Sequence, residues 1–270
     1  MILLTNIPLP KSTQDELADF QTAVNNEITY ADRVAAAKSL FSGRNRKGNP
    51  TFRVVRSTLD RMCGETSRCH YCEDSFADEI EHIRPKDLYP EQVFVWENYL
   101  YACGPCNGTS KGSHFAVFEP ASDHFIDVTR RRGDPIIPPT EGEYVFIDPR
   151  SENPLSYFKM DLSGTFFFIP IAPPGTREYQ RARYTIDILR LNSRDALVKA
   201  RESAFGSYKA RLSEYREKRI KGANTEELIY LQEGFRAMDH PTVWEEMKRQ
   251  QILYSELRAL FQDIPEAMGW

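Results

Sequence analysis

Hydrophobic residues recur at helical spacing near both ends of the chain, and this pattern predicts a mostly helical protein. Residues 12–42 form the first such segment, which Ser12 and Thr13 open ahead of acidic residues in the manner of a capping box. A further helix is predicted from Asn49-Pro50, because asparagine caps helix N-termini and proline fits the first turn. Its apolar stripe comprises Phe52, Val55, Leu59 and Met62.

The middle of the chain predicts strands, and its last third predicts helices again. Residues 79–83 alternate polar and apolar, while residues 144–147 and 165–169 are short apolar runs between turn-type sequences. Residues 176–263 return to helical spacing. Breaks in this helical region are predicted near Asn192, at residues 221–224 and at residues 239–241. The fold class expected is therefore α+β, predominantly helical.

Composition is that of an ordinary soluble protein, with 41% hydrophobic residues and no apolar run near the roughly 20 residues that span a bilayer. The first residues lack the basic region and apolar stretch of a signal peptide, so a cytoplasmic location is expected. The net charge of −4 is unusual for a protein that binds nucleic acid through phosphates alone. Residues 44–68, however, contain seven Lys or Arg against two acidic residues. This run is either a solvated helix face or a local basic surface.

Four of the five cysteines form two C-x-x-C pairs, Cys69/Cys72 and Cys103/Cys106, and Cys63 is left over. Four thiolates suit a closed, tetrahedral zinc site, which is structural rather than catalytic. The 30 residues between the pairs exceed the common spacing of about 15–20, so the insert is expected to have a function of its own. The second pair, Cys-Gly-Pro-Cys, also matches a thioredoxin-type redox sequence, but that alternative requires a βαβ context that this sequence does not predict.

The insert contains the dipeptide Glu81-His82, and Asn107 directly follows the last cysteine. A neutral histidine suits a general base near pH 7. One carboxylate and one amide oxygen, from Glu81 and Asn107, leave a hard divalent ion with open positions for water and phosphate. On a regular strand, however, Glu79 and Glu81 share one face and His82 lies on the other, so Glu81 and His82 diverge unless the strand bends. A single histidine on a strand is also commonly a core or surface residue.

The ordered set of motifs from residue 69 to residue 111 resembles the HNH endonuclease family, whose ββα-metal fold combines two strands, a metal ion and a helix. Its pattern of C-x-x-C, an acid-His-Ile-x-Pro-Lys motif, W-x-N and C-x-x-C-N-x-x-x-Lys is present here in that order. The resemblance implies that His82 activates water, that Glu81 and Asn107 bind catalytic Mg²⁺ or Mn²⁺, and that Asn98 fixes the loop carrying the base.

Further residues within the resemblance have implied but less specific roles. The zinc-knuckle subgroup is matched by Cys69, Cys72, Cys103 and Cys106. Phosphate contacts, with a plain surface role as the alternative, are implied for Arg84, Lys86 and Lys111. Three segments are then expected: an N-terminal helical segment at 1–64, a nuclease core at 65–118, and a recognition region at 119–270.

The flanking residues 148–154 and 185–192 are similar to HNH proteins of bacterial anti-phage systems of the Septu and retron-linked types. That similarity implies a nuclease subunit that acts on nucleic acid, DNA more than RNA, with an ABC/SMC-like ATPase docked on the C-terminal helical region. The alternatives are a free-standing restriction-like nuclease, a non-catalytic zinc-stabilised nucleic-acid-binding module, and a thiol redox protein.

Overall fold

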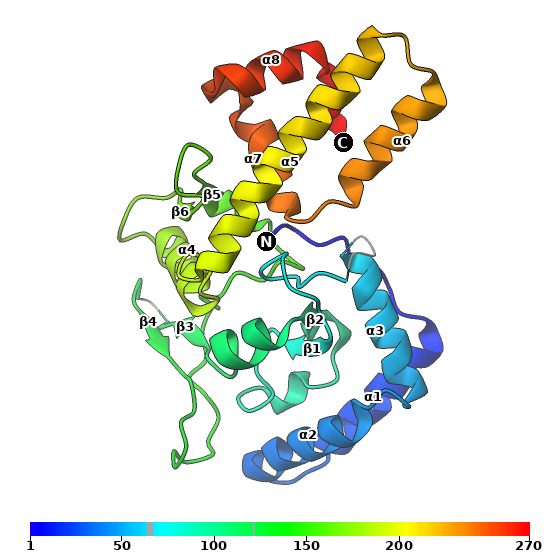
Figure 1. The fold of residues 1–270 in the computed structure, drawn as a ribbon. Helices are drawn as coiled ribbons and strands as arrows, with labels where there is room; N and C mark the ends of the chain where they lie inside the picture. The colour runs from blue at the N-terminus through cyan, green and yellow to red at the C-terminus, as the bar shows by residue number, and fades with distance from the viewer. Residues whose placement is uncertain (64–66, 121) are drawn as a thin grey trace.

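A computed structural model describes residues 1–63, 67–120 and 122–270 of the chain. Figure 1 shows helices α1 to α3 at one end, α5 to α8 at the other, and three small sheets between them. The α+β, predominantly helical prediction is confirmed at this level. Among the described residues, no helix combines the length and apolar character that crossing a membrane requires.

The N-terminal helices differ from the prediction at one point. The single helical run expected over residues 12–42 is two helices, α1 (Lys11–Asn25) and α2 (Tyr30–Arg44). The break occurs because Thr29 caps α2, and its hydroxyl accepts a hydrogen bond from the Asp32 backbone N–H at 3.1 Å. Helix α3 (Pro50–Met62) begins as predicted.

Three antiparallel hairpins form the sheets, and each contains two strands. They are β1 (Glu79–His82) with β2 (Tyr99–Ala102), β3 (Ala116–Phe118) with β4 (Phe125–Asp127), and β5 (Phe158–Met160) with β6 (Phe168–Pro170). The strand predicted at 79–83 is confirmed, and that at 165–169 is confirmed only at its end. The strand predicted at 144–147 is wrong: this segment makes one isolated bridge, and its apolar residues fill the core instead of pairing.

The C-terminal helices follow the predicted breaks. They are α4 (Arg177–Ile188), α5 (Asp195–Ile220), α6 (Thr225–Arg236), α7 (Pro241–Gln250) and α8 (Ser255–Asp263). An additional break at Gln251–Leu253 was not predicted, and it leaves Leu253 exposed.

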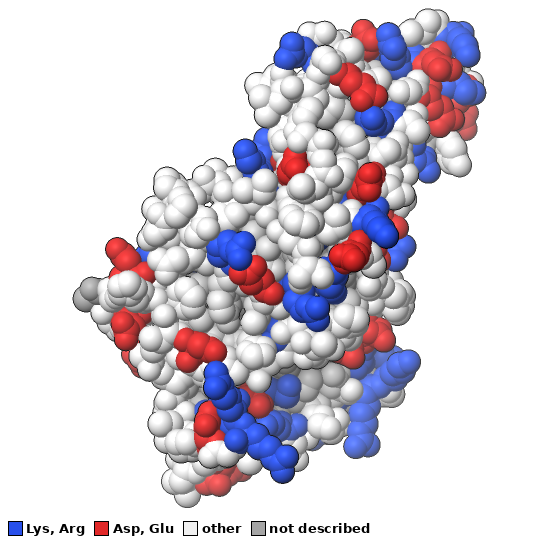
Figure 2. Space-filling model, turned by 60° about the vertical axis from the view of Figure 1, so that its left-hand side comes forward, with Lys and Arg blue, Asp and Glu red and all other residues white. Residues whose placement is uncertain are grey.

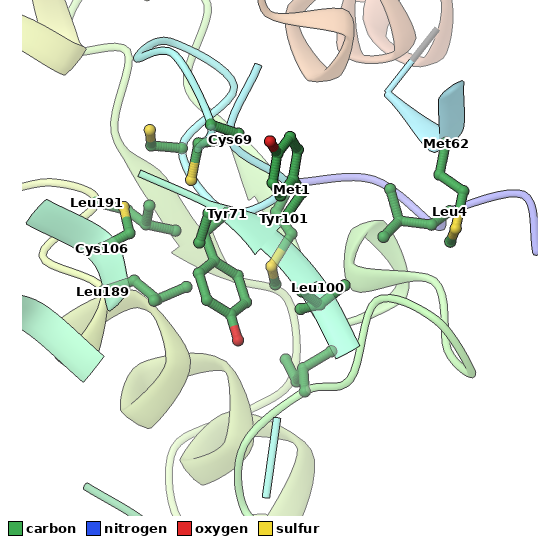
Figure 3. Packing of buried hydrophobic residues seen from close by; sticks show 14 of the residues in the cluster. Met1, Leu4, Met62, Cys69, Tyr71, Leu100, Tyr101, Cys106, Leu189 and Leu191 are labelled. Carbon is green, nitrogen blue, oxygen red and sulfur yellow. The ribbon is translucent and has the colours of Figure 1, made fainter. Parts of the chain in front are cut away.

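One large apolar cluster draws residues from all three predicted segments, so they pack together around a shared core. Figure 3 shows part of this contact, where Leu189 and Leu191, which follow α4, lie beside Cys106 and Tyr71 of the central block. The C-terminal helices also meet this block through an ion pair between Arg68 and Asp239 at 2.7 Å. The predicted division at residue 119 stays a prediction, and that at residue 64 lies outside the described residues.

Candidate functional site

The β1–β2 hairpin and the short helix η3 (Pro105–Lys111) form the centre of the motif region. Register pairs Glu81 with Leu100 and His82 with Tyr99. Helix η3 is a π-helix, in which the Gly112 N–H donates to the Asn107 carbonyl at 2.7 Å, and Gly112 ends it at a positive φ of 47°. Such widened turns are common at functional sites, and this one places Asn107 and Lys111 against β1.

The four paired cysteines form one buried cluster, with all Sγ atoms within 4.8 Å of one another. Zinc–sulfur bonds of about 2.3 Å in a tetrahedron place sulfurs about 3.8 Å apart, and the Sγ atoms of Cys72 and Cys103 are 3.9 Å apart. The donor set and spacing therefore fit a structural zinc ion. Because both C-x-x-C pairs lie in one cluster, a shared zinc site is favoured over a separate redox pair of Cys103 and Cys106.

Arg194, which immediately precedes α5, contacts this cluster and was not predicted. Its Nη2 donates to Cys106 Sγ at 3.3 Å and to the Leu189 carbonyl at 2.9 Å. A guanidinium beside thiolates offsets their negative charge and fixes one ligand. No local sequence signal identifies Arg194, because 88 positions separate it from the cysteine that it contacts.

His82 is buried in an aromatic environment on the side of β1 that faces the N-terminal helices. Its ring lies 4.4 Å from the Phe41 ring and 5.3 Å from the Tyr99 ring, centroid to centroid. Its Nε2 lies 3.0 Å from the Val93 carbonyl, which only accepts, so Nε2 carries the proton and Nδ1 is the basic nitrogen. Burial, assisted by the charge of Lys86, lowers the pKa of His82 to about 3 and keeps the ring neutral.

Glu81 points to the opposite side, toward η3, as strand alternation predicts. Its Oε1 accepts from the Lys111 ammonium at 2.5 Å, and the ammonium also donates to the His82 carbonyl at 2.8 Å. Burial raises the pKa of Glu81, and the ammonium opposes that shift. Lys111 is fully buried, so this geometry does not favour the phosphate contact predicted for it.

Replacing Lys111 with methionine is expected to destabilise the fold by about 3–5 kcal/mol, because it leaves the Glu81 carboxylate buried without its counter-charge. Adding Glu81→Gln should recover part of that loss. The matched control is Lys209→Met, which breaks a more exposed pair with Glu256 and should cost about 0–1 kcal/mol. Urea unfolding of the four proteins measures these differences, and equal costs for Lys111→Met and Lys209→Met would contradict the assignment.

Asn98 holds together the loop that follows β1. Its Oδ1 accepts from the Arg84 N–H at 2.8 Å, and its Nδ2 donates to the carbonyls of Arg84 and Gln92 at 3.1 and 2.9 Å. Gln92 directly precedes Val93, whose carbonyl fixes the His82 ring. These contacts suit the predicted orienting role, which itself stays a prediction.

An open pocket of about 540 Å³ brings several predicted residues together. Its lining includes Glu81, His82, Lys86 and Asn107, and also residues that sequence reasoning did not assign to the site: Lys47, Arg56, Asp78 and Glu79. Asn98 and Lys111 are buried and do not line the pocket. Arg84 lies elsewhere, with its guanidinium over the Tyr144 ring at 4.3 Å, so the structure separates it from the other predicted phosphate contacts.

Two basic side chains from the region between α2 and α3 line this pocket, Lys47 of the connecting loop and Arg56 of α3. Arg46, Lys47 and Arg53 are exposed, and none of them forms an ion pair with a carboxylate in the described part of the chain. In the face seen in Figure 2, Lys and Arg predominate toward the lower right, while both charges mix over the upper end. The basic run in the sequence was the signal for this surface.

Comparison with known proteins gives one limited similarity. The chain is 33% identical over 93 residues to the Septu protein PtuB of Bacillus thuringiensis. That alignment covers 33% of this chain and 34% of the relative, so the match spans about a third of either protein. No protein-family model matches the chain. No solved structure matches it either.

Proposed function

We propose that the protein is a metal-dependent endonuclease of the HNH type that hydrolyses phosphodiester bonds in nucleic acid. The observation that carries this proposal is the neutral His82, fixed by Val93 with Nδ1 as its basic nitrogen, at a pocket that also contains carboxylates and Asn107. In this proposal, the hairpin and η3 that supply these groups serve as the two strands and helix of a ββα-metal core.

His82 is suited to take a proton from an attacking water. Nδ1 has no hydrogen-bond partner among the described residues, and the ring cannot rotate without losing the Val93 contact. The fixed tautomer leaves the Nδ1 lone pair open to a proton, although burial makes the ring a weaker base than a free histidine. General-base catalysis typically contributes about 10²–10⁴ in rate. Asn98 supports the geometry by holding the loop that ends at Val93.

The pocket's oxygen donors fit a hard divalent cation such as Mg²⁺ or Mn²⁺. Carboxylates of Glu79 and Glu81 and the amide of Asn107 border the same space, and these are the donors that such ions prefer. When bound, the ion would stabilise negative charge on the scissile phosphate and the leaving oxygen. Lys86 and Arg56 border the same space and are placed to attract the phosphate.

Nucleic acid is the substrate class that the surrounding charge supports, despite the net charge of −4. Lys47 lines the pocket, and the exposed cations Arg46 and Arg53 lie within six residues of it in the sequence. Their lack of carboxylate partners among the described residues leaves their charge available. DNA is the preferred substrate in this proposal, and the assay below compares it with RNA.

The purified protein is expected to cut nucleic acid only with Mg²⁺ or Mn²⁺ present. Supercoiled plasmid, single-stranded DNA and RNA are each incubated with either ion or with excess EDTA. Metal-stimulated cleavage of any of them supports the nuclease. Tight binding of all three without cleavage, at every metal concentration and with a candidate ATPase subunit added, would favour the non-catalytic binding module.

We further propose that the nuclease is the effector of a bacterial anti-phage system and acts with an ATPase subunit. The similarity to the Septu protein PtuB supports this role. Plaque assays should show protection by the chain expressed with its ATPase partner, and loss of protection with His82→Gln. Equal plaque numbers for the wild type and the empty vector, across a broad phage panel, would argue for a free-standing restriction-like nuclease.

A further inference from the structure

Two carboxylates on β1 face η3, and their environments differ sharply. Glu81 is 3% exposed and paired with a fully buried ammonium, whereas Glu79 is exposed. On the basis of the proposed nuclease function, we propose that Glu79, with Asn107, binds the catalytic divalent ion directly, and that Glu81 is a positioning residue that acts through Lys111.

A hydrogen bond already holds the Glu79 and Asn107 side chains next to each other. The Asn107 Nδ2 is 2.7 Å from Glu79 Oε2, and both side chains line the pocket. A rotation of the Asn107 amide by half a turn presents its Oδ1 in place of Nδ2, beside the carboxylate. Two oxygens from adjacent side chains then leave several positions for water and a phosphate oxygen.

Glu81 is a poor direct ligand because its charge is already compensated. An ion bound to Glu81 would lie close to the Lys111 ammonium, and the two cations would repel each other. Withdrawing Glu81 from that pair would instead leave the ammonium buried with only the His82 carbonyl as partner. Breaking a buried pair in this way is strongly unfavourable, and ion binding would have to offset that loss.

The same pair explains what Glu81 does. Lys111 ends η3 and holds both the Glu81 carboxylate and the His82 carbonyl, so it fixes η3 against the end of β1. That contact sets the position of Asn107, one turn earlier on η3, relative to Glu79. The adjacent Glu-His dipeptide thus divides its functions, with Glu81 securing the framework and His82 facing the reaction.

Titration of the zinc-loaded protein with Mn²⁺ alone tests this assignment, followed by electron paramagnetic resonance or calorimetry. Glu79→Gln removes the charge of a direct ligand and should weaken Mn²⁺ binding by about tenfold or more. Glu81→Gln should change it less while lowering the melting temperature. The matched control is Asp78→Asn, which removes one exposed carboxylate from the same pocket and should leave the affinity near that of the wild type.

His82→Gln separates this inference from the proposed function, because it should slow cleavage by about 10²–10⁴ while Mn²⁺ still binds. Wild-type Mn²⁺ affinity in Glu79→Gln, with loss of binding in Glu81→Gln, would overturn the assignment and leave the nuclease intact. Equal weakening by Glu79→Gln and Asp78→Asn would also overturn it, since general charge would then explain the effect. If the wild type binds no Mn²⁺ and cuts no substrate, both proposals fail.

Discussion

Cleavage by the His82→Ala variant is expected to be slower by about 10²–10⁴ than cleavage by the wild type, in the same metal ion and at the same substrate concentration. The reason is that His82 lines the pocket, and the Val93 carbonyl fixes its tautomer so that Nδ1 is the basic nitrogen. Substrate binding should change little, because the residues proposed to attract the phosphate are Lys86 and Arg56, and His82 is not among them.

The variant also removes a ring that packs against Phe41 and Tyr99, so stability must be measured together with rate. His82→Gln keeps most of the volume and is the more informative variant if His82→Ala melts early. His114→Ala is the control, since His114 is exposed and does not line the pocket. Nicking time courses under saturating Mn²⁺ compare the four proteins. A His82→Gln protein that cuts as fast as the wild type would refute His82 as the base.

Local sequence signals were sufficient for much of this fold. Asn49-Pro50 marked the start of α3, and the alternation over residues 79–83 marked β1, because capping and strand periodicity depend on neighbouring residues. The same alternation also predicted that Glu81 and His82 diverge. The apolar run at residues 144–147 was wrongly predicted to be a strand. A short apolar run indicates that a segment is buried, and this segment is buried by side-chain packing and not by pairing with another strand.

The site was predictable only as far as its motifs extend. The motif predicts roles for His82 and Asn107, but it does not reveal that Lys111, 30 positions from Glu81, forms an ion pair with that carboxylate. Arg194 is further still from Cys106 and belongs to another predicted segment. Such partners are chosen by tertiary packing, so the sequence predicts the ligand types, while the fold decides which carboxylate is free.

Removing the zinc ion is expected to have the largest effect on the structure. The four cysteines come from the loop before β1 and from the turn that opens η3, so a bound zinc ion would join the two halves of the hairpin unit. Structural zinc contributes about 10–16 kcal/mol of apparent binding free energy in small zinc-dependent modules. The β1–β2 and η3 region should therefore lose its order without zinc, and cleavage should be lost with it.

Cys103→Ser is the test variant, and Cys63→Ser is its control because Cys63 lies outside the cluster. Mass spectrometry of the metal should find one zinc per wild-type chain, one in Cys63→Ser, and much less in Cys103→Ser. Strong chelators should lower the wild-type melting temperature to near that of Cys103→Ser, and added zinc should restore it. A wild-type protein that carries no zinc, and whose Cys103 and Cys106 titrate as a reversible disulfide, would contradict the zinc site and favour the redox alternative, because only that alternative needs these two sulfurs paired with each other.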